Sequence, residues 1–337
     1  MQTSTGENTT AASVGLSLVI PCYNEGRVLP LLQERLLRSL PELKLSWEVI
    51  LVDDGSRDDT FGQLAAMHAA DARFKVISFS RNFGHQTAVF AGLSHAQGEF
   101  VAVMDADLQD PPEFVATGIA KLKEGYDVVY AVRRQRKESL FKRTGYALFY
   151  RLIKLIAEIE IPLDSGDFCV MRQCVVSALR TMPERDVFVR GLRAWSGFRQ
   201  TGLEYERHAR AAGDTKYPLH KLVRLAMDGV FAFSAFPLRL ATYLGFISLA
   251  VSLGAAVVLL LWKIFNFKMF GHYPAEVPGW TSIVCLVLFM GGMQFLILGV
   301  MGEFIGRIYN EVKQRPRWII REALGINTAD PRPHPRP

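Results

Sequence analysis

Two aspartates with one residue between them, Asp105 and Asp107, directly follow the apolar run Phe100–Met104. Residues i and i+2 of an extended strand share one face, so we expect both carboxylates on one side, with the Gln109 carbonyl two residues further on. This all-oxygen set suits Mg²⁺ or Mn²⁺, which keep several waters and bridge to substrate phosphates. The alternative is a solvated turn that begins the next helix at Pro112.

The segment that must position these carboxylates alternates short β-rich runs with helical patterns. The runs are Leu16–Ile20, Glu48–Val52, Lys75–Phe79, Phe100–Met104 and Asp127–Val132, and the helical patterns are Val28–Leu40, Asp59–Ala70, His85–Ala96 and Pro112–Glu124. Apolar strands separated by helices predict an α/β fold with a doubly wound, mostly parallel sheet. Ligands of such sheets bind beyond the carboxyl ends of the strands. The pair Asp53-Asp54 lies at another such end and favours the metal interpretation.

Several function classes lack their sequence signatures. No GxGxxG follows the first predicted strand and no Gly-rich Walker loop is present, which argues against a dinucleotide oxidoreductase and a P-loop NTPase. The four cysteines form no CxxC, so we expect reduced thiols rather than a disulfide scaffold. Lys and Arg exceed Asp and Glu by 39 to 33, but no nucleic-acid-binding module is recognisable, and no nucleic-acid partner is expected.

Two long uncharged runs lie in the C-terminal third of the chain. Leu240–Trp262 and Trp280–Gly302 each contain 23 residues without Asp, Glu, Lys or Arg. A helix of that length spans about 34 Å, enough to cross a bilayer core of about 30 Å. A buried core helix is the alternative, although such helices are usually shorter. The preceding residues 218–239 mix basic residues with Leu, Val and Phe, which is typical of amphipathic helices at the membrane interface.

The charges that flank the two runs predict their orientation. The loop 263–279 carries two Lys, whereas eight basic residues flank the outer ends: Lys221, Arg224, Arg239, Arg307, Lys313, Arg315, Arg317 and Arg321. The positive-inside rule places both termini in the cytoplasm. We therefore expect a multi-pass protein of the inner (cytoplasmic) membrane. Its predicted parts are a disordered N-terminal tail (1–15), a cytoplasmic α/β domain (16–217), interface helices (218–239), transmembrane helices (240–262 and 280–302) around an extracytoplasmic loop (263–279), and a cytoplasmic basic tail (303–337).

Four motifs resemble, in order and spacing, those of the inverting family 2 glycosyltransferases of GT-A fold. They are SLVIPCYNE (17–25), VDDGS (52–56), SRNFG (80–84) and DADLQDPPE (105–113). The stretch RHARAAGDTKY (207–217), followed by two predicted spans, resembles the polyprenyl-phosphate glycosyltransferases. That group includes the dolichol-phosphate mannose synthases and the bacterial bactoprenol (undecaprenyl-phosphate) glucosyl and aminoarabinose transferases. The likeness covers about residues 16–320 and implies transfer of a sugar from a nucleotide-sugar donor to a membrane polyprenyl phosphate.

The resemblance implies donor-side roles position by position. A nucleoside pocket would be lined by Pro21, Tyr23, Glu25, Asp53 and Asp105. Asp105 would hold the ribose or the metal, and Asp107 and Gln109 would bind Mg²⁺ or Mn²⁺ against the diphosphate. The cation would offset the charge that develops on the leaving nucleoside diphosphate.

The resemblance also implies an acceptor side built from cations. The basic residues that match acceptor-phosphate positions are Arg133, Lys142 or Arg143, Arg210 and Lys216. Asp167 occupies the position of a base or an acceptor-orienting carboxylate, and its alternative role is that of a turn residue or ion-pair partner. A lipid phosphate is already ionised near neutral pH, so a strong base is not required. His85 begins a predicted helix, where a donor phosphate could be near, but a capping or surface role is the expectation.

The donor and the class of protein have competing interpretations. UDP-glucose fits best on the family likeness around Arg190–Leu192 and Phe198–Gln200, while GDP-mannose and a UDP-4-amino-4-deoxy-arabinose derivative stay open. A processive polysaccharide synthase would carry a QxxRW motif, which is absent. A catalytically inactive lipid-carrier scaffold or flippase partner would not need the intact aspartate motif. Because two spans bury little surface by themselves, we expect a homo-oligomer, with a tetramer as the guess from the nearest relatives.

Overall fold

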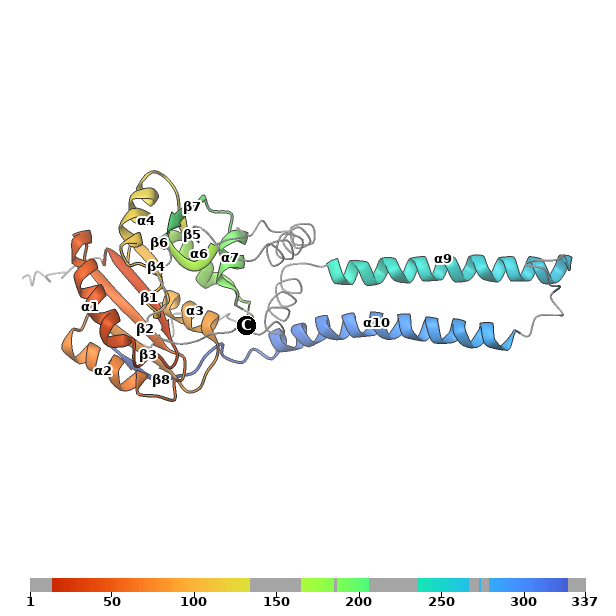
Figure 1. The fold of residues 1–337 in the computed structure, drawn as a ribbon, viewed down its shortest axis with the longest axis horizontal. Helices are drawn as coiled ribbons and strands as arrows, with labels where there is room; N and C mark the ends of the chain where they lie inside the picture. Colours follow the sequence, from red (N-terminus) through yellow and green to blue (C-terminus); the bar gives the residue numbers. More distant parts are fainter. Residues whose placement is uncertain are drawn as a thin grey trace, which may run out of the picture. The chain divides into compact units, whose positions relative to one another are not determined.

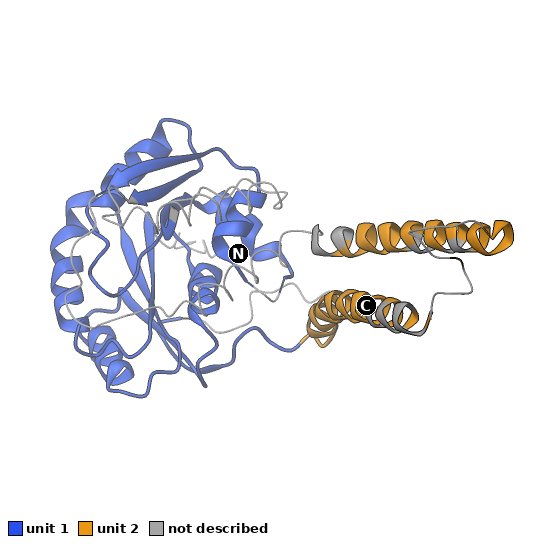
Figure 2. Cartoon of the chain, turned by 45° about the vertical axis from the view of Figure 1, so that its right-hand side comes forward, with its two compact units in different colours: residues 1–150, 159–217, 315–337 blue, residues 151–158, 218–314 orange. Residues whose placement is uncertain are grey.

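The computed structural model of the chain describes residues 14–133, 165–184, 187–205, 236–266, 273 and 279–326. They belong to two compact units (Figure 2). Unit 1 contains residues 1–150, 159–217 and 315–337, and unit 2 contains residues 151–158 and 218–314. The predicted interface helices lie outside the described residues, except for the last positions, which already belong to a long helix that begins at Phe236.

Within the described residues, unit 1 is built on one eight-stranded sheet of order β7-β5-β6-β4-β1-β2-β3-β8 (Figure 1). The strands are β1 (Leu16–Cys22), β2 (Trp47–Asp53), β3 (Phe74–Phe79), β4 (Phe100–Val103), β5 (Val128–Arg133), β6 (Ser165–Arg172), β7 (Gln200–Tyr205) and β8 (Ile320–Leu324). The pairs β1–β2, β1–β4, β2–β3 and β5–β7 are parallel. Strands β6 and β8 run antiparallel to their neighbours.

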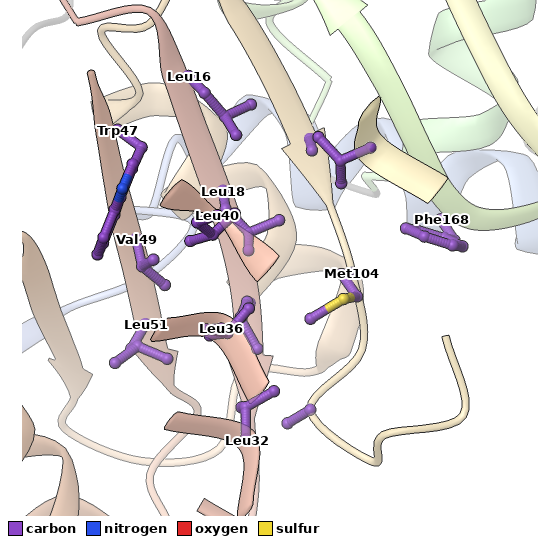
Figure 3. Close-up of a cluster of buried hydrophobic side chains, with 14 of the residues drawn as sticks. Leu16, Leu18, Leu32, Leu36, Leu40, Trp47, Val49, Leu51, Met104 and Phe168 are labelled. Atoms are coloured by element: carbon purple, nitrogen blue, oxygen red, sulfur yellow. The ribbon is translucent and has the colours of Figure 1, made fainter. Parts of the chain in front are cut away.

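Helices cover both faces of the sheet because the central strands are apolar on both sides. One face packs against α1 (Leu29–Ser39), α2 (Thr60–Ala70) and α4 (Phe114–Lys123), and the other against α3 (His85–His95), α6 (Gln173–Thr181) and α7 (Val189–Trp195). Figure 3 shows the first of these cores, in which Leu32, Leu36 and Leu40 lie against Leu18 of β1 and Val49 of β2. The three- and four-residue spacing of these leucines is what places them on a single helix face.

The predicted fold class, a doubly wound α/β fold with a mostly parallel sheet, is confirmed. The first five strands and first four helices lie where the apolar pattern predicts them, to within a few residues. The unpredicted strand β6 inserts antiparallel between β4 and β5, with Val103 in register with Cys169. This register places the start of β6 beside the carboxyl end of β4, which Asp105 and Asp107 (the aspartate motif) follow.

Unit 2 contains the long helices α9 (Phe236–Phe265) and α10 (Trp280–Val312). Two segments among the described residues, Ala241–Phe265 and Phe289–Val312, are long and apolar enough to cross a membrane, with mean hydropathies of 2.5 and 1.4. Both helices extend beyond the predicted spans 240–262 and 280–302. In α10 the extension includes an ion pair one turn apart, Arg307 to Glu303 at 3.0 Å, a spacing that stabilises helices in water.

The chain after α10 returns to the sheet of unit 1. The sequence predicts only a basic tail over residues 303–337, but in the structure β8 pairs antiparallel with β3. Its sequence IREAL carries two charges, which is typical of an edge strand and hides its strand character from an apolar pattern. Strands β7 and β8 therefore precede and follow α9 and α10 in the sequence and belong to one sheet.

Two leucines of α1 test this account of the core. Leu36 is fully buried, whereas Leu31 on the same helix is 53% exposed. We expect Leu36→Ala to remove packing worth about 2–5 kcal/mol, which lowers Tm by roughly 5–15 °C. Leu31→Ala should stay within about 0.5 kcal/mol of the parent protein. Thermal unfolding of the purified proteins in detergent measures both, and equal Tm values for the two variants would contradict the packing.

Candidate active site

The loops that follow β1 and β2 are tied together by hydrogen bonds. The backbone N–H of Asn24 donates to Ser56 Oγ at 3.0 Å, and that of Glu25 donates to Thr60 Oγ1 at 2.9 Å. Asn24 adopts a left-handed conformation, with φ of 56°, which asparagine tolerates better than most residues. The two loops thus form one platform at the carboxyl edge of the sheet, from which Tyr23 projects with 42% of its surface exposed.

Asp53 lies beneath this platform and has no exposed surface. Its Oδ1 accepts a hydrogen bond from the N–H of Ser56 at 2.9 Å, and its Oδ2 accepts one from Ser78 Oγ at 2.8 Å. Pro21 is also buried, in register with Val52 of β2. Of the predicted nucleoside-pocket residues at this end, Tyr23 is exposed and Glu25 is half-buried, while Asp53 connects the ends of β2 and β3.

Asp54 orders the loop that leads into α3. Its carboxylate accepts hydrogen bonds from the N–H of Phe83 at 2.6 Å and of Gly84 at 2.9 Å. Burial raises the pKa of Asp54 above its ordinary value, although these two N–H groups oppose the rise. Gly84 has φ of 103°, a conformation that L side chains rarely adopt. The loop therefore fixes His85, the first residue of α3, near the carboxyl ends of the parallel strands.

His85 lies between two of the predicted carboxylates. Its Nε2 is 3.7 Å from Oδ1 of Asp105 and 3.4 Å from Oδ2 of Asp167. Burial alone would lower the pKa of His85, but the hydrogen bond to Asp167 and the charge of Asp105 raise it above its ordinary value. The side chain of His85 is 46% exposed, as expected for a surface position, and the insertion of β6 beside β4 adds the contact with Asp167, which the sequence did not predict.

Three polar side chains, those of His85, Gln86 and Arg190, contact the carboxylate of Asp167. Its carboxylate accepts hydrogen bonds from Gln86 Nε2 at 2.8 Å and from Arg190 Nε at 2.8 Å. Gln86 is held in turn, because its Oε1 accepts the N–H of Val189 at 3.0 Å. Burial alone would raise the pKa of Asp167, but the hydrogen bond from His85 and the charge of Arg190 outweigh burial and hold it well below its ordinary value. Asp167 is therefore an ionised carboxylate fixed by α3 and α7.

Negative charge accumulates at the end of β4. Burial raises the pKa of Asp105 to about 6 despite the nearby His85, and the charges of Asp110, Asp167 and Asp107 add to the rise. Burial is the largest cause, and the neighbouring carboxylates add electrostatic repulsion. A bound cation would relieve it.

The aspartate loop fits a divalent cation of the kind that takes part of its ligands from substrate. The Oδ1 of Asp107 accepts the N–H of Gln109 at 3.1 Å, and Leu108 between them has φ of 60°. Among the described residues no group of three or more His, Cys, Asp or Glu side chains is arranged as a complete metal site. Mg²⁺ needs no such group, since it usually keeps several waters and binds one or two carboxylates plus substrate phosphates.

Of the residues predicted to bind the acceptor phosphate, the structure describes only the backbone of Arg133. The backbone of Arg133 ends β5 in register with Tyr205 of β7. The other residues predicted to bind the acceptor phosphate lie outside the described residues: Lys142, Arg143, Arg210 and Lys216. Their roles stay predictions.

Two partners of Asp167, Gln86 and Arg190, were not predicted as site residues. Gln86 had a usable signal, because it follows His85 at the start of a helix that comes directly after a strand-end loop, and such positions face the ligand edge of the sheet. The sequence offers no comparable signal for Arg190, because its approach to Asp167 depends on where α7 packs.

Comparison with known proteins identifies the family of the chain. The model of the family "Glycosyl transferase family 2" matches residues 17–180. The chain is 44% identical to the uncharacterized glycosyltransferase YkcC of Bacillus subtilis (strain 168), over 92% of this chain and 94% of that protein. It is 39% identical to the prophage bactoprenol glucosyl transferase homolog of Escherichia coli (strain K12), over 91% and 98%. Among solved structures, glucosyl-3-phosphoglycerate synthase from Mycobacterium tuberculosis with Mn²⁺ and UDP-glucose is 20% identical, with a TM-score of 0.42 over 65% of this chain and 78% of that chain.

The contact between Arg190 and Asp167 can be tested without an activity assay. Arg190→Ala leaves a buried carboxylate with one fewer hydrogen-bond donor, which should reduce the free energy of unfolding by about 1–3 kcal/mol. The double variant Arg190→Ala/Asp167→Asn should lose less than the single variant, because the uncompensated charge is gone. Arg199→Ala is the matched control, since its exposed guanidinium lies over Tyr126, 5.6 Å from the ring centroid. Equal Tm values for Arg190→Ala and Arg199→Ala would refute the stabilising contact.

Proposed function

Because the chain belongs to glycosyl transferase family 2, we propose that it moves glucose from UDP-glucose onto a polyprenyl phosphate, undecaprenyl phosphate in bacteria, at the cytoplasmic face of a membrane. Relatives that match nearly the whole chain and are named bactoprenol glucosyl transferases support this choice of acceptor and sugar. Figure 1 shows the arrangement that supports the proposal, in which strands and helices distant in sequence meet at one edge of the sheet.

The observation that carries the proposal is the meeting of Asp105, His85, Asp167 and Arg190 at that edge. A transferase of this kind must hold a nucleoside diphosphate as it leaves, and both the leaving group and the acceptor are anions. Asp105 and Asp107, with Gln109 beside them, would bind Mg²⁺ or Mn²⁺, which supplies positive charge against the diphosphate. The accumulated negative charge around Asp105 supports this assignment.

The chemistry assigned to the site is an in-line displacement with inversion. A phosphate oxygen of the lipid attacks the anomeric carbon, a new carbon–oxygen bond forms, and the bond to the nucleoside diphosphate breaks. A phosphate monoester is largely ionised at pH 7, so no proton has to be removed from the nucleophile.

Asp167 is then better suited to orientation than to general base catalysis. A carboxylate whose pKa lies well below its ordinary value is a weak base. Its contacts with His85, Gln86 and Arg190 instead fix those three side chains at the site. We assign Asp167 the role of a positioning residue for the acceptor side, which includes Arg133 and the predicted basic residues of the later loops.

The topology of the sheet supports attachment to one face of a membrane. Strands β7 and β8 precede and follow the two apolar helices and lie in one sheet, so an even number of crossings must separate them. The exposed apolar side chains of these helices, such as Phe246, Leu253 and Phe295, are suited to lipid. We propose that both termini are cytoplasmic, as the charge distribution predicts, and that the chain forms a homo-oligomer through these helices.

A donor panel tests the reaction and names the sugar. Purified protein with Mn²⁺ or Mg²⁺ and undecaprenyl phosphate should yield a lipid-linked hexose from UDP-glucose, detected by mass, and little product from GDP-mannose or UDP-4-amino-4-deoxy-arabinose. Asp107→Ala should lower the rate by at least about a hundredfold, since it removes a ligand of the charge-offsetting ion.

Glu124→Gln is the control for Asp107→Ala, because Glu124 pairs with Lys121 on the exposed end of α4. Full activity of Asp107→Ala would overturn the metal assignment. Absence of product from every donor, with folded protein, would overturn the proposed reaction.

Cysteine labelling tests the topology. Tyr273, between the two helices, is exposed, and Tyr273→Cys should react with a membrane-impermeant maleimide in intact cells. Cys174 of α6 is also exposed and should react only after lysis, which makes it an internal control on the opposite side. Labelling of Cys174 in intact cells, with position 273 protected, would reverse the orientation.

A further inference from the structure

The edge strand β8 carries an irregularity at Arg321. Ile320 is in register with Phe79 and Glu322 with Ser78, so β8 advances two residues where β3 advances one. Arg321 is the extra residue of this β-bulge. Bulges are frequent at sheet edges and next to active sites, where they redirect a side chain.

The bulge directs Arg321 toward the end of β2. A guanidinium N–H of Arg321 donates to Ser78 Oγ at 2.9 Å, and Ser78 donates to the carboxylate of Asp53. The guanidinium is 3.9 Å from Asp53 Oδ2 and lies over the ring of Phe61, 5.2 Å from its centroid. The side chain is nevertheless 49% exposed, so it combines a buried anchor with accessible hydrogen-bond donors.

Residues other than Arg321 also hold β8 in place. Trp318 stacks on Phe79 with ring centroids 6.3 Å apart, and Arg317 donates to the carbonyl of Met182 at 2.6 Å. The N–H of Ser80 donates to the carbonyl of Ile319 at 2.9 Å. These contacts precede the bulge and dock the strand in addition to the hydrogen bond between Arg321 and Ser78.

The position of Arg321 favours one part of a donor. In the sheet, β3 is three strands from β4, about 14 Å at a strand spacing of roughly 4.8 Å. A diphosphate held at the aspartate motif after β4 therefore lies far from Arg321, whereas the nucleoside would extend toward Asp53 and β3. An arginine offers five N–H donors and a flat face, which suit the carbonyls and the plane of a nucleobase.

We propose that Arg321 is a donor-binding residue that contacts the nucleoside of the nucleotide-sugar, so the segment after α10 completes the donor site. The inference rests on the proposed function and extends it, since the family model ends at residue 180 and does not reach β8. Donor recognition would then depend on residues that precede α9 in the sequence and on a residue that follows α10.

Calorimetry on the full-length protein in detergent tests this with UDP, GDP and uridine as probes, in the presence of Mn²⁺. Arg321→Ala should weaken binding of the nucleotide that the parent protein prefers by about ten- to a hundredfold, as expected for a lost hydrogen bond to a charged group. Binding of uridine, or of guanosine if GDP is preferred, should weaken to the same extent. In turnover assays the KM for the donor should rise, with kcat and the KM for the lipid nearly unchanged.

Two variants separate this role from a structural one. Arg317→Ala loosens the same segment and should lower Tm without changing nucleotide affinity. Ser78→Ala removes the link from Arg321 to Asp53 but keeps the guanidinium, and should weaken binding less than Arg321→Ala. Equal weakening by Ser78→Ala would mean that Arg321 acts only through Asp53, which would overturn the direct contact.

The remaining outcomes are also decisive. Weakened binding of the nucleotide but not of its nucleoside would move the contact to the phosphates and overturn the assignment. Unchanged affinity in Arg321→Ala would refute the inference alone. Failure of the parent protein to bind either nucleotide would refute the proposed function with it.

Discussion

The burial of negative charge at the end of β4 is the constraint on which the rest of the site depends. Asp105, Asp107 and Asp110 lie within six residues of one another, and Asp167 joins them from β6. Like charges this close are tolerated only where cations or hydrogen-bond donors face them. Helix α3 brings His85 and Gln86 to this place and α7 brings Arg190, and all three side chains contact the carboxylate of Asp167.

Buried carboxylates also fix the loops around the site. Asp53 connects the ends of β2 and β3 through Ser56 and Ser78, and Asp54 holds the N–H groups that lead into α3. A charge buried in this way is stable only while these donors stay in place. The loops at the carboxyl ends of these strands are therefore held as one unit in a defined geometry.

The extent to which the sequence predicts this site follows from the range of the interactions. The strands before the aspartate motif were predictable because the pattern of Leu18, Ile20, Val49 and Leu51 reports local burial on a sheet covered by helices. The pairing of His85 with Asp167 was not, because it depends on the antiparallel insertion of β6 and its register with β4. No periodicity encodes a contact between residues 82 positions apart in the chain. Strand β8 was hidden for a different reason, since its charged residues lie on an exposed sheet edge.

The antiparallel insertion of β6 gives the carboxyl end of β4 a second source of negative charge. The carboxylates gather where β4 and β6 meet, because the register of Val103 with Cys169 brings Asp167 beside Asp105 and Asp107. Burial alone would raise the pKa of Asp167, but the hydrogen bond from His85 and the charge of Arg190 hold it well below its ordinary value. The inserted strand thus does more than extend the sheet, because it adds a fixed negative charge at the end of β4.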